Sequence, residues 1–155
     1  MNKSLVFWGY TVEILISALA VVSLCLWVST ESLLTFLRTA ALDFATLFGA
    51  VMLAAALAFL WTFFSKADTP FYRWLDSRGA FQVYLRATAY AVLVSLLSIF
   101  SLIVYKYVDN RNIGLAAAFL LALALVNMCT LVANVIGLMR LNANFMQKIA
   151  EKSNR

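Results

Sequence analysis

The sequence predicts an all-α, polytopic membrane protein: a bundle of four transmembrane helices. Four long apolar stretches fill most of the 155 residues, three short polar breaks separate them, and 65% of all residues are hydrophobic. Each stretch has close to or more than the roughly 20 residues with which a helix crosses about 30 Å of hydrocarbon. Backbone inside lipid must satisfy its own hydrogen bonds, which favours helices. The expected spans are 5–28, 44–64, 87–105 and 113–139.

The first stretch is expected to stay in the mature protein as a helix. Its apolar run is longer than that of a secretory signal peptide, Glu13 interrupts it, and no small-x-small cleavage site follows at Ser29 to Ser32. Residues 1–140 are therefore interpreted as a transmembrane domain and residues 141–155 as a basic, amphipathic tail.

Between the second and third spans, the sequence predicts a short amphipathic helix that lies in the headgroup plane as an elbow. Asp68 and Thr69 offer capping oxygens just before Pro70, which suits the first position of a helix. The apolar side of this elbow would hold Phe71, Trp74 and Leu75, and its polar side Arg73 and Asp76.

The fourth span is expected to continue into the tail as an amphipathic helix. Leu141, Phe145 and Ile149 recur every four residues and form an apolar stripe. Such a stripe needs a partner, for which the sequence leaves three candidates: the elbow, a neighbouring subunit or another protein.

The distribution of Lys and Arg predicts that both termini are cytoplasmic, an N-in, C-in topology. With four spans, the N-terminus, the second break and the tail share one side of the membrane. That side carries nine basic residues: Lys3, Lys66, Arg73, Arg78, Arg86, Arg140, Lys148, Lys152 and Arg155. The other side carries Arg38, Lys106 and Arg111. Short loops rich in Lys and Arg stay in the cytoplasm.

Composition argues against several classes of activity. The chain has no His, which excludes an imidazole base and a His-ligated metal. Cys25 and Cys129 lie far apart without metal-ligand spacing and are interpreted as small buried hydrophobic residues. We therefore expect no enzyme activity, cofactor or metal. Direct nucleic-acid binding is not expected either, because no known binding fold fits into such short polar segments.

Glu13 is the most informative single residue, because ionisable side chains inside a membrane are costly and rare. Glu13 and Ser17 share a helix face, so the carboxyl group can point into the bundle. It is interpreted either as a proton or cation site, or as a carboxyl group kept neutral by burial. The alternative is a Glu at headgroup depth, near the start of the first span.

Other polar residues in the spans are candidates for lining a pore or joining helices. Asn127, Thr130 and Asn134 follow i, i+3, i+7 spacing on one stripe of the fourth span, and Ser95 and Ser98 lie in the third. They can serve as interhelical hydrogen-bonding groups, as an oligomer contact or as the wall of a polar pore. Small residues in four-residue steps in the second span also indicate assembly: Thr46, Ala50, Ala54 and Ala58.

The cytoplasmic bases have two interpretations. They can fix topology and attract the headgroups of the lipid bilayer. They can also form a docking face for an acidic cytoplasmic protein, for which the candidate residues are Arg73, Arg78, Lys148 and Lys152.

The layout resembles a family of small membrane proteins. The alanine-rich second span runs into Phe59 to Phe64 (FLWTFF), a basic aromatic elbow follows, and the fourth span ends at Gly137 to Asn142 (GLMRLN). This pattern resembles the RexB-like tetraspan proteins of lambda-type phage exclusion and, more loosely, the membrane subunit of Kiwa-type anti-phage systems. The resemblance implies a component of phage defence in the bacterial inner membrane, which either depolarises the membrane as an ion-conducting effector or anchors a cytoplasmic partner. It carries over no site residues.

Three functions remain open at this point. The first is an oligomeric, ion-conducting effector that depolarises the membrane. The second is a membrane scaffold or sensor that recruits a cytoplasmic effector through its basic face. The third is a small accessory subunit of a transporter. The first two lead us to expect a homo-oligomer, because four helices rarely enclose a hydrated pore.

Overall fold

The structure is a computed structural model that describes the backbone of residues 3–153 and the side chains of residues 9–46 and 49–151. All regular elements in the described part of the chain are helical, which confirms the all-α prediction. The elements in chain order are α1 (Lys3–Val28), α2 (Thr30–Thr39), α3 (Ala41–Asp43), the π-helix η1 (Phe44–Gly49), α4 (Ala50–Lys66), α5 (Pro70–Ser77), α6 (Phe81–Tyr107) and α7 (Arg111–Ser153).

Four helical segments are long and apolar enough to cross a membrane: Gly9–Val28, Ala41–Lys66, Phe81–Tyr107 and Arg111–Glu151. The second runs without a break through α3, η1 and α4. Length and composition therefore identify the chain as a multi-pass membrane protein, as the sequence predicts.

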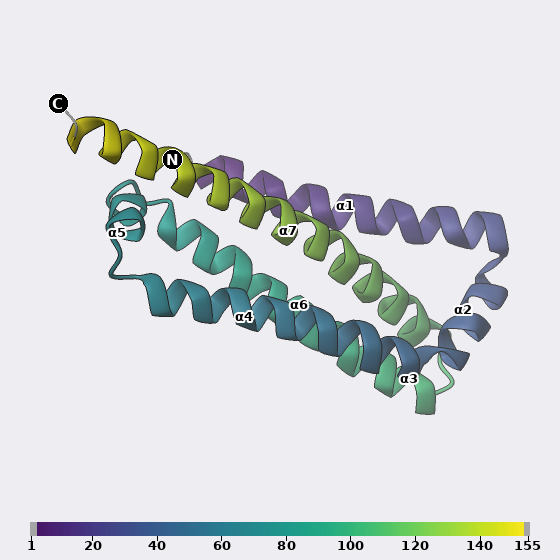
Figure 1. The fold of residues 1–155 in the computed structure, drawn as a ribbon. Helices are drawn as coiled ribbons and strands as arrows, with labels where there is room; N and C mark the ends of the chain where they lie inside the picture. The colour runs from purple at the N-terminus through teal and green to yellow at the C-terminus, as the bar shows by residue number, and fades with distance from the viewer. Residues whose placement is uncertain (1–2, 154–155) are drawn as a thin grey trace.

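The four spans lie side by side, with α6 and α7 in the middle (Figure 1). The helix α1 packs along α7, and α4 packs along α6. Only 11% of the α1 span is buried, against 33% for the spans of α6 and α7. Most of the α1 surface is therefore free to contact lipid or another subunit.

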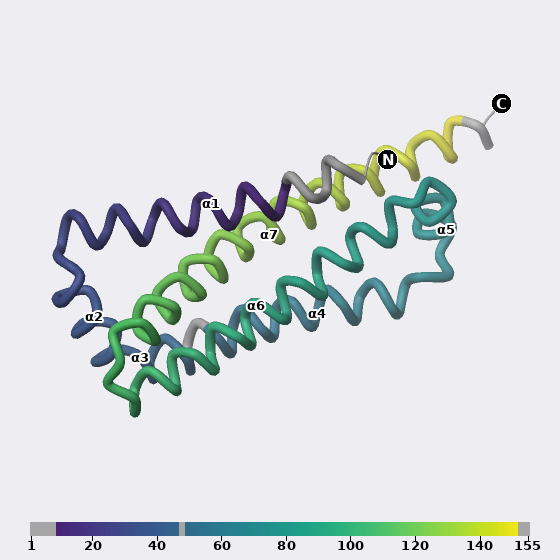
Figure 2. The backbone as a smooth tube through the Cα atoms, turned by 180° about the vertical axis from the view of Figure 1, so that it is seen from behind, coloured from purple at the N-terminus to yellow at the C-terminus, as the bar shows by residue number. Residues whose placement is uncertain are grey.

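The two ends of the bundle differ. Both ends of the chain lie at the end that holds α5, which we call the elbow end, as the view from behind also shows (Figure 2). The opposite end, here the far end, holds α2, α3 and the connection between α6 and α7. The three segments in which the sequence concentrates basic residues thus share the elbow end.

At the far end, the polar break between the first two spans contains a helix, α2, that the sequence pattern did not predict. Ser29 turns the chain with φ of 70°, and its hydroxyl accepts a hydrogen bond from the Ser32 N–H at 3.3 Å, which caps the helix. Leu34 and Leu37 are buried on its inner side. The helix α2 is only ten residues long, so its apolar repeat spans less than three turns and was not recognised in the sequence.

Side-chain contacts hold α2 to the ends of α6 and α7. The Tyr105 hydroxyl donates to the Leu34 carbonyl at 3.1 Å, and Lys106 Nζ donates to the Arg38 carbonyl at 3.1 Å. The Arg38 guanidinium pairs with Asp109 at 2.8 Å. These contacts cover an apolar core that includes Val21, Leu102, Ala117 and Ala118.

At the elbow end, α5 is present as predicted, but its cap is different. The Thr69 hydroxyl donates backward to the Lys66 carbonyl at 2.9 Å, and no side chain caps the N-terminus of the helix. Asp68 lies 3.9 Å from Arg73 instead. Pro70 starts the helix without a cap because its missing N–H needs no partner.

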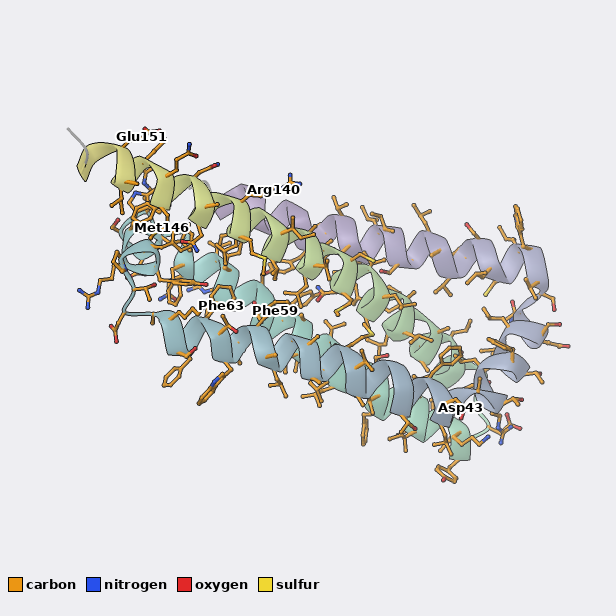
Figure 3. The ribbon with its side chains drawn as sticks, in the orientation of Figure 1. Asp43, Phe59, Phe63, Arg140, Met146 and Glu151 are labelled. Atoms are coloured by element: carbon orange, nitrogen blue, oxygen red, sulfur yellow. The ribbon has the colours of Figure 1, made fainter. Side chains whose placement is uncertain are left out.

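The tail continues α7 to Ser153, and the elbow is the partner of its apolar stripe. The ring of Phe145 lies 5.1 Å from that of Trp74 and 5.6 Å from that of Phe71, between centroids. Leu141 joins the same cluster around buried Leu75. In Figure 3, Phe63 on α4 and Met146 on α7 mark this region, and Asp43 marks the far end. Burial in this cluster raises the pKa of the Tyr72 phenol above its ordinary value.

Candidate functional site: a buried carboxyl group

Glu13 points into the bundle and bonds to α7. Asn127 Nδ2 donates to Glu13 Oε2 at 2.9 Å, and Thr130 Oγ1 lies 2.6 Å from Glu13 Oε1. Glu13 is 9% exposed and Asn127 5%. Counted along each helix, Glu13 lies about 22 Å from the far end of α1 and Asn127 about 24 Å from the far end of α7. The carboxyl group is thus buried between α1 and α7 rather than on the surface of the bundle.

Helical spacing on both helices assembles this cluster. Asn127 and Thr130 are three residues apart on α7 and project from one face. Ser17 follows Glu13 by one turn of α1, is fully buried, and donates to the Glu13 backbone carbonyl at 2.7 Å. The small Ser17 side chain allows α1 to pack closely on α7.

The Thr130 hydroxyl has two partners but only one proton. Its oxygen lies 2.6 Å from Glu13 Oε1 and 2.9 Å from the Asn127 carbonyl oxygen. When Glu13 is ionised, Thr130 donates to its carboxylate. When Glu13 is protonated, the carboxyl O–H donates to Thr130, which then donates to the Asn127 carbonyl. Both protonation states are therefore hydrogen-bonded without movement of a heavy atom.

Glu13 has no cationic partner among the described side chains. The two ion pairs in that part of the chain are Arg38 with Asp109 and Arg73 with Asp68. An ionised carboxylate buried without an opposite charge is costly. The described side chains that bond to the Glu13 carboxyl group, Asn127 and Thr130, are both neutral.

A cavity of about 170 Å³ adjoins the carboxyl group. It is lined by Gly9, Tyr10, Glu13, Val83, Ala87, Asn127, Thr130, Leu131 and Asn134. From Glu13 it extends toward the elbow end, because Gly9, Val83 and Asn134 all lie on that side of the cluster. Its volume and polar atoms suit a few water molecules.

Aromatic rings lie beside the carboxyl group. Tyr10 on α1 meets Tyr90 on α6 edge to face, with centroids 4.7 Å apart. This contact joins α1 to α6 across the cavity. Arg86 lies one turn from Tyr90 on α6, toward the elbow end.

Between Glu13 and the far end, tightly packed side chains fill the bundle. Ser17 and Ala117 have no exposed surface, and Leu102 is 1% exposed. These residues belong to or adjoin the apolar core that the far-end contacts cover. A hollow of about 860 Å³ beside α2 lies beyond this core. Within a single chain, packed side chains thus cover the carboxyl group toward the far end, and its cavity lies toward the elbow end.

The structure brings together three of the six candidate polar residues of the spans. Glu13, Asn127 and Thr130 form the cluster, and Asn134 lines its cavity with an exposed side chain. Ser95 and Ser98 are buried in α6, about 8 to 12 Å beyond Tyr90 toward the far end. They belong to the α6 packing face.

Sequence analysis missed Tyr90 and the cavity walls at Val83 and Ala87. Tyr90 offered a signal, because it is an isolated phenol in an apolar stretch. Val83 and Ala87 offered none, since apolar residues recur throughout the spans.

The basic candidates at the elbow end fall into two groups. The Arg78 guanidinium lies 4.6 Å above the Trp74 ring, and Lys148 lies on the facing surface of α7. Arg73 projects away beside Asp68. Lys152 belongs to α7, but its side chain lies outside the described residues.

The cysteines give one correction. Cys25 is half-buried, whereas Cys129 is exposed on α7, although it was expected to be buried. Cys129 lies on the face of α7 that points away from Glu13. Among the described residues, no group of three or more Cys, Asp or Glu is arranged to hold a metal ion.

Fold and site together define a four-span membrane protein with a buried acid beside a small polar cavity. No family model matches the chain, and no curated protein or solved structure is similar enough to be matched. The functional argument therefore rests on the fold and the Glu13 cluster.

Proposed function

We propose that the Glu13 cluster is a proton-binding site reached from the cytoplasm, and that oligomers of the chain conduct protons and depolarise a bacterial inner membrane. The observation that supports this most directly is a buried carboxyl group with only neutral hydrogen-bond partners among the described residues, next to a cavity that extends toward the elbow end.

The ligand is a proton because the cluster suits both protonation states. The Thr130 hydroxyl reverses its role between donor and acceptor, so Glu13 gains or loses a proton without repacking. A bound metal cation would require several oxygen ligands, whereas the Asn127 amide presents its N–H₂ group to the carboxylate.

Cytoplasmic access follows from the positive-inside rule. Basic residues outnumber acidic ones in the segments at the elbow end, and such segments stay in the cytoplasm. The cavity beside Glu13 extends from the carboxyl group toward that same end. Protons would thus enter from the cytoplasmic side.

An oligomer is needed because the core of one chain closes the far half of the bundle. Two exposed surfaces suit contacts between subunits. One is α1, of which little is buried. The other is the outer face of η1 and α4, where the stripe of Thr46, Ala50, Ala54 and Ala58 is exposed. Small residues at this spacing allow close approach of helices in lipid.

The biological setting in this proposal is phage defence, which the RexB-like layout implies. An effector of this kind would dissipate the membrane potential during infection and so deprive phage replication of energy. Proton conduction, the orientation in the membrane and the role in phage defence can be tested separately, and proton conduction is tested first.

The experiment measures membrane potential with a voltage-sensitive dye in bacteria that express the chain, with and without phage challenge. Wild type is compared with Glu13→Gln, in which an amide keeps both hydrogen bonds but cannot carry the proton. Glu31→Gln is the matched control, because Glu31 is an exposed acid at the far end.

We expect wild type and Glu31→Gln to depolarise the membrane and Glu13→Gln to leave it polarised, at equal membrane levels of the three proteins. Depolarisation by Glu13→Gln equal to wild type would refute the role of the carboxyl group. A steady potential with wild type under both conditions would refute conduction.

A further inference from the structure

A second cavity lies at the elbow end, between α5 and the extension of α7. Its volume is about 370 Å³. It is lined by Trp74, Arg78, Leu141, Asn144, Phe145, Lys148 and Ile149. No contact of the Glu13 cluster involves these residues, so the groove is a separate feature of the molecule.

The groove combines an aromatic floor with cations on both rims. Trp74 from α5 and Phe145 from α7 pack with centroids 5.1 Å apart and form the floor. Arg78 stands on one rim, held 4.6 Å above the Trp74 ring, and Lys148 stands on the other. None of the lining residues is acidic. An anionic group between Arg78 and Lys148 would therefore meet two positive charges without repulsion.

The apolar part of the groove continues toward the membrane. Leu141 directly follows Arg140, the basic residue that ends the apolar part of α7, and Ile149 is 44% exposed at the other end of the stripe. A ligand here needs a charged group and an apolar portion, at the depth of the headgroups. Basic pockets at helix ends on the cytoplasmic side are suited to anionic lipid headgroups.

We propose that this groove binds one anionic phospholipid, with the phosphate between Arg78 and Lys148 and the upper acyl chain against Leu141 and Phe145. The occupant would bridge α5 and α7 and stabilise the elbow against the tail. This inference is independent of the proton site, because it involves other helical segments and no residue of the Glu13 cluster.

The test uses Trp74 as a reporter in the full-length protein in nanodiscs. Trp8, Trp27 and Trp61 are replaced by Phe, which leaves Trp74 as the sole indole. Brominated phosphatidylglycerol is then titrated into a phosphatidylcholine background, and quenching of Trp74 gives the half-saturating fraction of the anionic lipid. Brominated phosphatidylcholine alone measures quenching by a neutral lipid.

The affected variant is Arg78→Gln with Lys148→Gln, and the matched control is Lys66→Gln with Arg73→Gln. Both remove two charges from the elbow end, and the control residues are exposed and do not line the groove. Removing each groove base should weaken binding of the anionic lipid about fivefold. The half-saturating fraction of phosphatidylglycerol should therefore rise about 30-fold in the groove variant. In the control it should change by about twofold or less, because Lys66 and Arg73 lie outside the groove and act on its occupant only through screened, longer-range attraction.

Three results would overturn the proposal. One is equal quenching by the anionic and neutral lipids, and another is an equal shift in the two double variants. The third is quenching insensitive to phosphatidylglycerol but strongly changed by an acidic peptide, which would assign the groove to a protein partner. Saturable quenching that only the groove variant loses would establish the lipid site.

Discussion

The same three helices, α1, α6 and α7, build two very different halves of the bundle. Toward the elbow end they enclose a polar cluster and a cavity of about 170 Å³ around Glu13. Toward the far end they pack Val21, Leu102 and Ala117 into an apolar core, with Tyr105 bonded to α2 above it. The difference shows that burial of an acid in a membrane protein need not imply a channel through one chain. It can produce a half-open site that faces one side.

The largest expected effect is a difference in chemical access between the two halves. In a background without Cys25 and Cys129, Ala87→Cys places a thiol on the cavity wall and Ala117→Cys places one in the far core. A small, membrane-impermeant thiol reagent should modify Ala87→Cys from the cytoplasmic side alone and Ala117→Cys from neither side, because a thiol must ionise in water to react. Labelling is measured by mass shift in inverted and right-side-out vesicles.

The two variants introduce the same side chain on helices of the same bundle, so each controls for expression and insertion of the other. Modification of Ala117→Cys as fast as Ala87→Cys would mean that water reaches both halves. Modification of Ala87→Cys only from the outside would reverse the proposed orientation.

A second comparison concerns how tightly the halves are packed. A methyl group on Gly114 would lie 2.6 Å from the Tyr105 ring and 2.7 Å from Leu34, whereas one on Gly9 meets no described atom within 4 Å. We expect Gly114→Ala to lower the free energy of unfolding by about 1–3 kcal/mol through overpacking. Gly9→Ala should be neutral or stabilising by up to about 1 kcal/mol, because Ala is the better helix former. Unfolding by a denaturing detergent, followed by circular dichroism, gives both values.

If Gly114→Ala proved as stable as Gly9→Ala, Tyr105 would be free to rotate away. Its hydroxyl would then lose the hydrogen bond to the Leu34 carbonyl, and the far end would be less tightly packed than its contacts indicate. The far half would then not be more tightly packed than the elbow half.

Much of the fold could be predicted because a membrane leaves the chain few options. Span length, hydropathy and the amphipathic repeat of Phe71, Trp74 and Leu75 fix the four spans and the elbow. The i, i+3 spacing of Asn127 and Thr130 indicated one polar stripe on α7. These signals are local, and each depends on a single helix.

What sequence reasoning could not supply is the pairing between helices. Nothing in the residues themselves shows that Glu13 meets Asn127, which is 114 positions away, or that the elbow covers Phe145. The walls at Val83 and Ala87 resemble every other apolar residue of the spans. The helix α2 was missed because its two buried leucines give too short a repeat to distinguish it from a loop.

The smallest expected effect concerns the hydrogen bonds to Glu13, which distinguish the elbow half from the apolar far half. Asn127→Leu leaves a Glu13 oxygen without its donor, which should destabilise the bundle by about 1–3 kcal/mol. In a double-mutant cycle with Glu13→Leu, the coupling energy should be about 0.6–2 kcal/mol, the range for interhelical hydrogen bonds in membranes. The control cycle pairs Glu13→Leu with Ser98→Ala, a buried polar residue of α6 outside the cluster, and should give a coupling of less than about 0.5 kcal/mol. Zero coupling in both cycles would mean that the hydrogen bonds to Glu13 do not position it. The one-sided site would then be held by the surrounding apolar packing alone, and the exchange of the Thr130 proton between two acceptors would lose its structural basis.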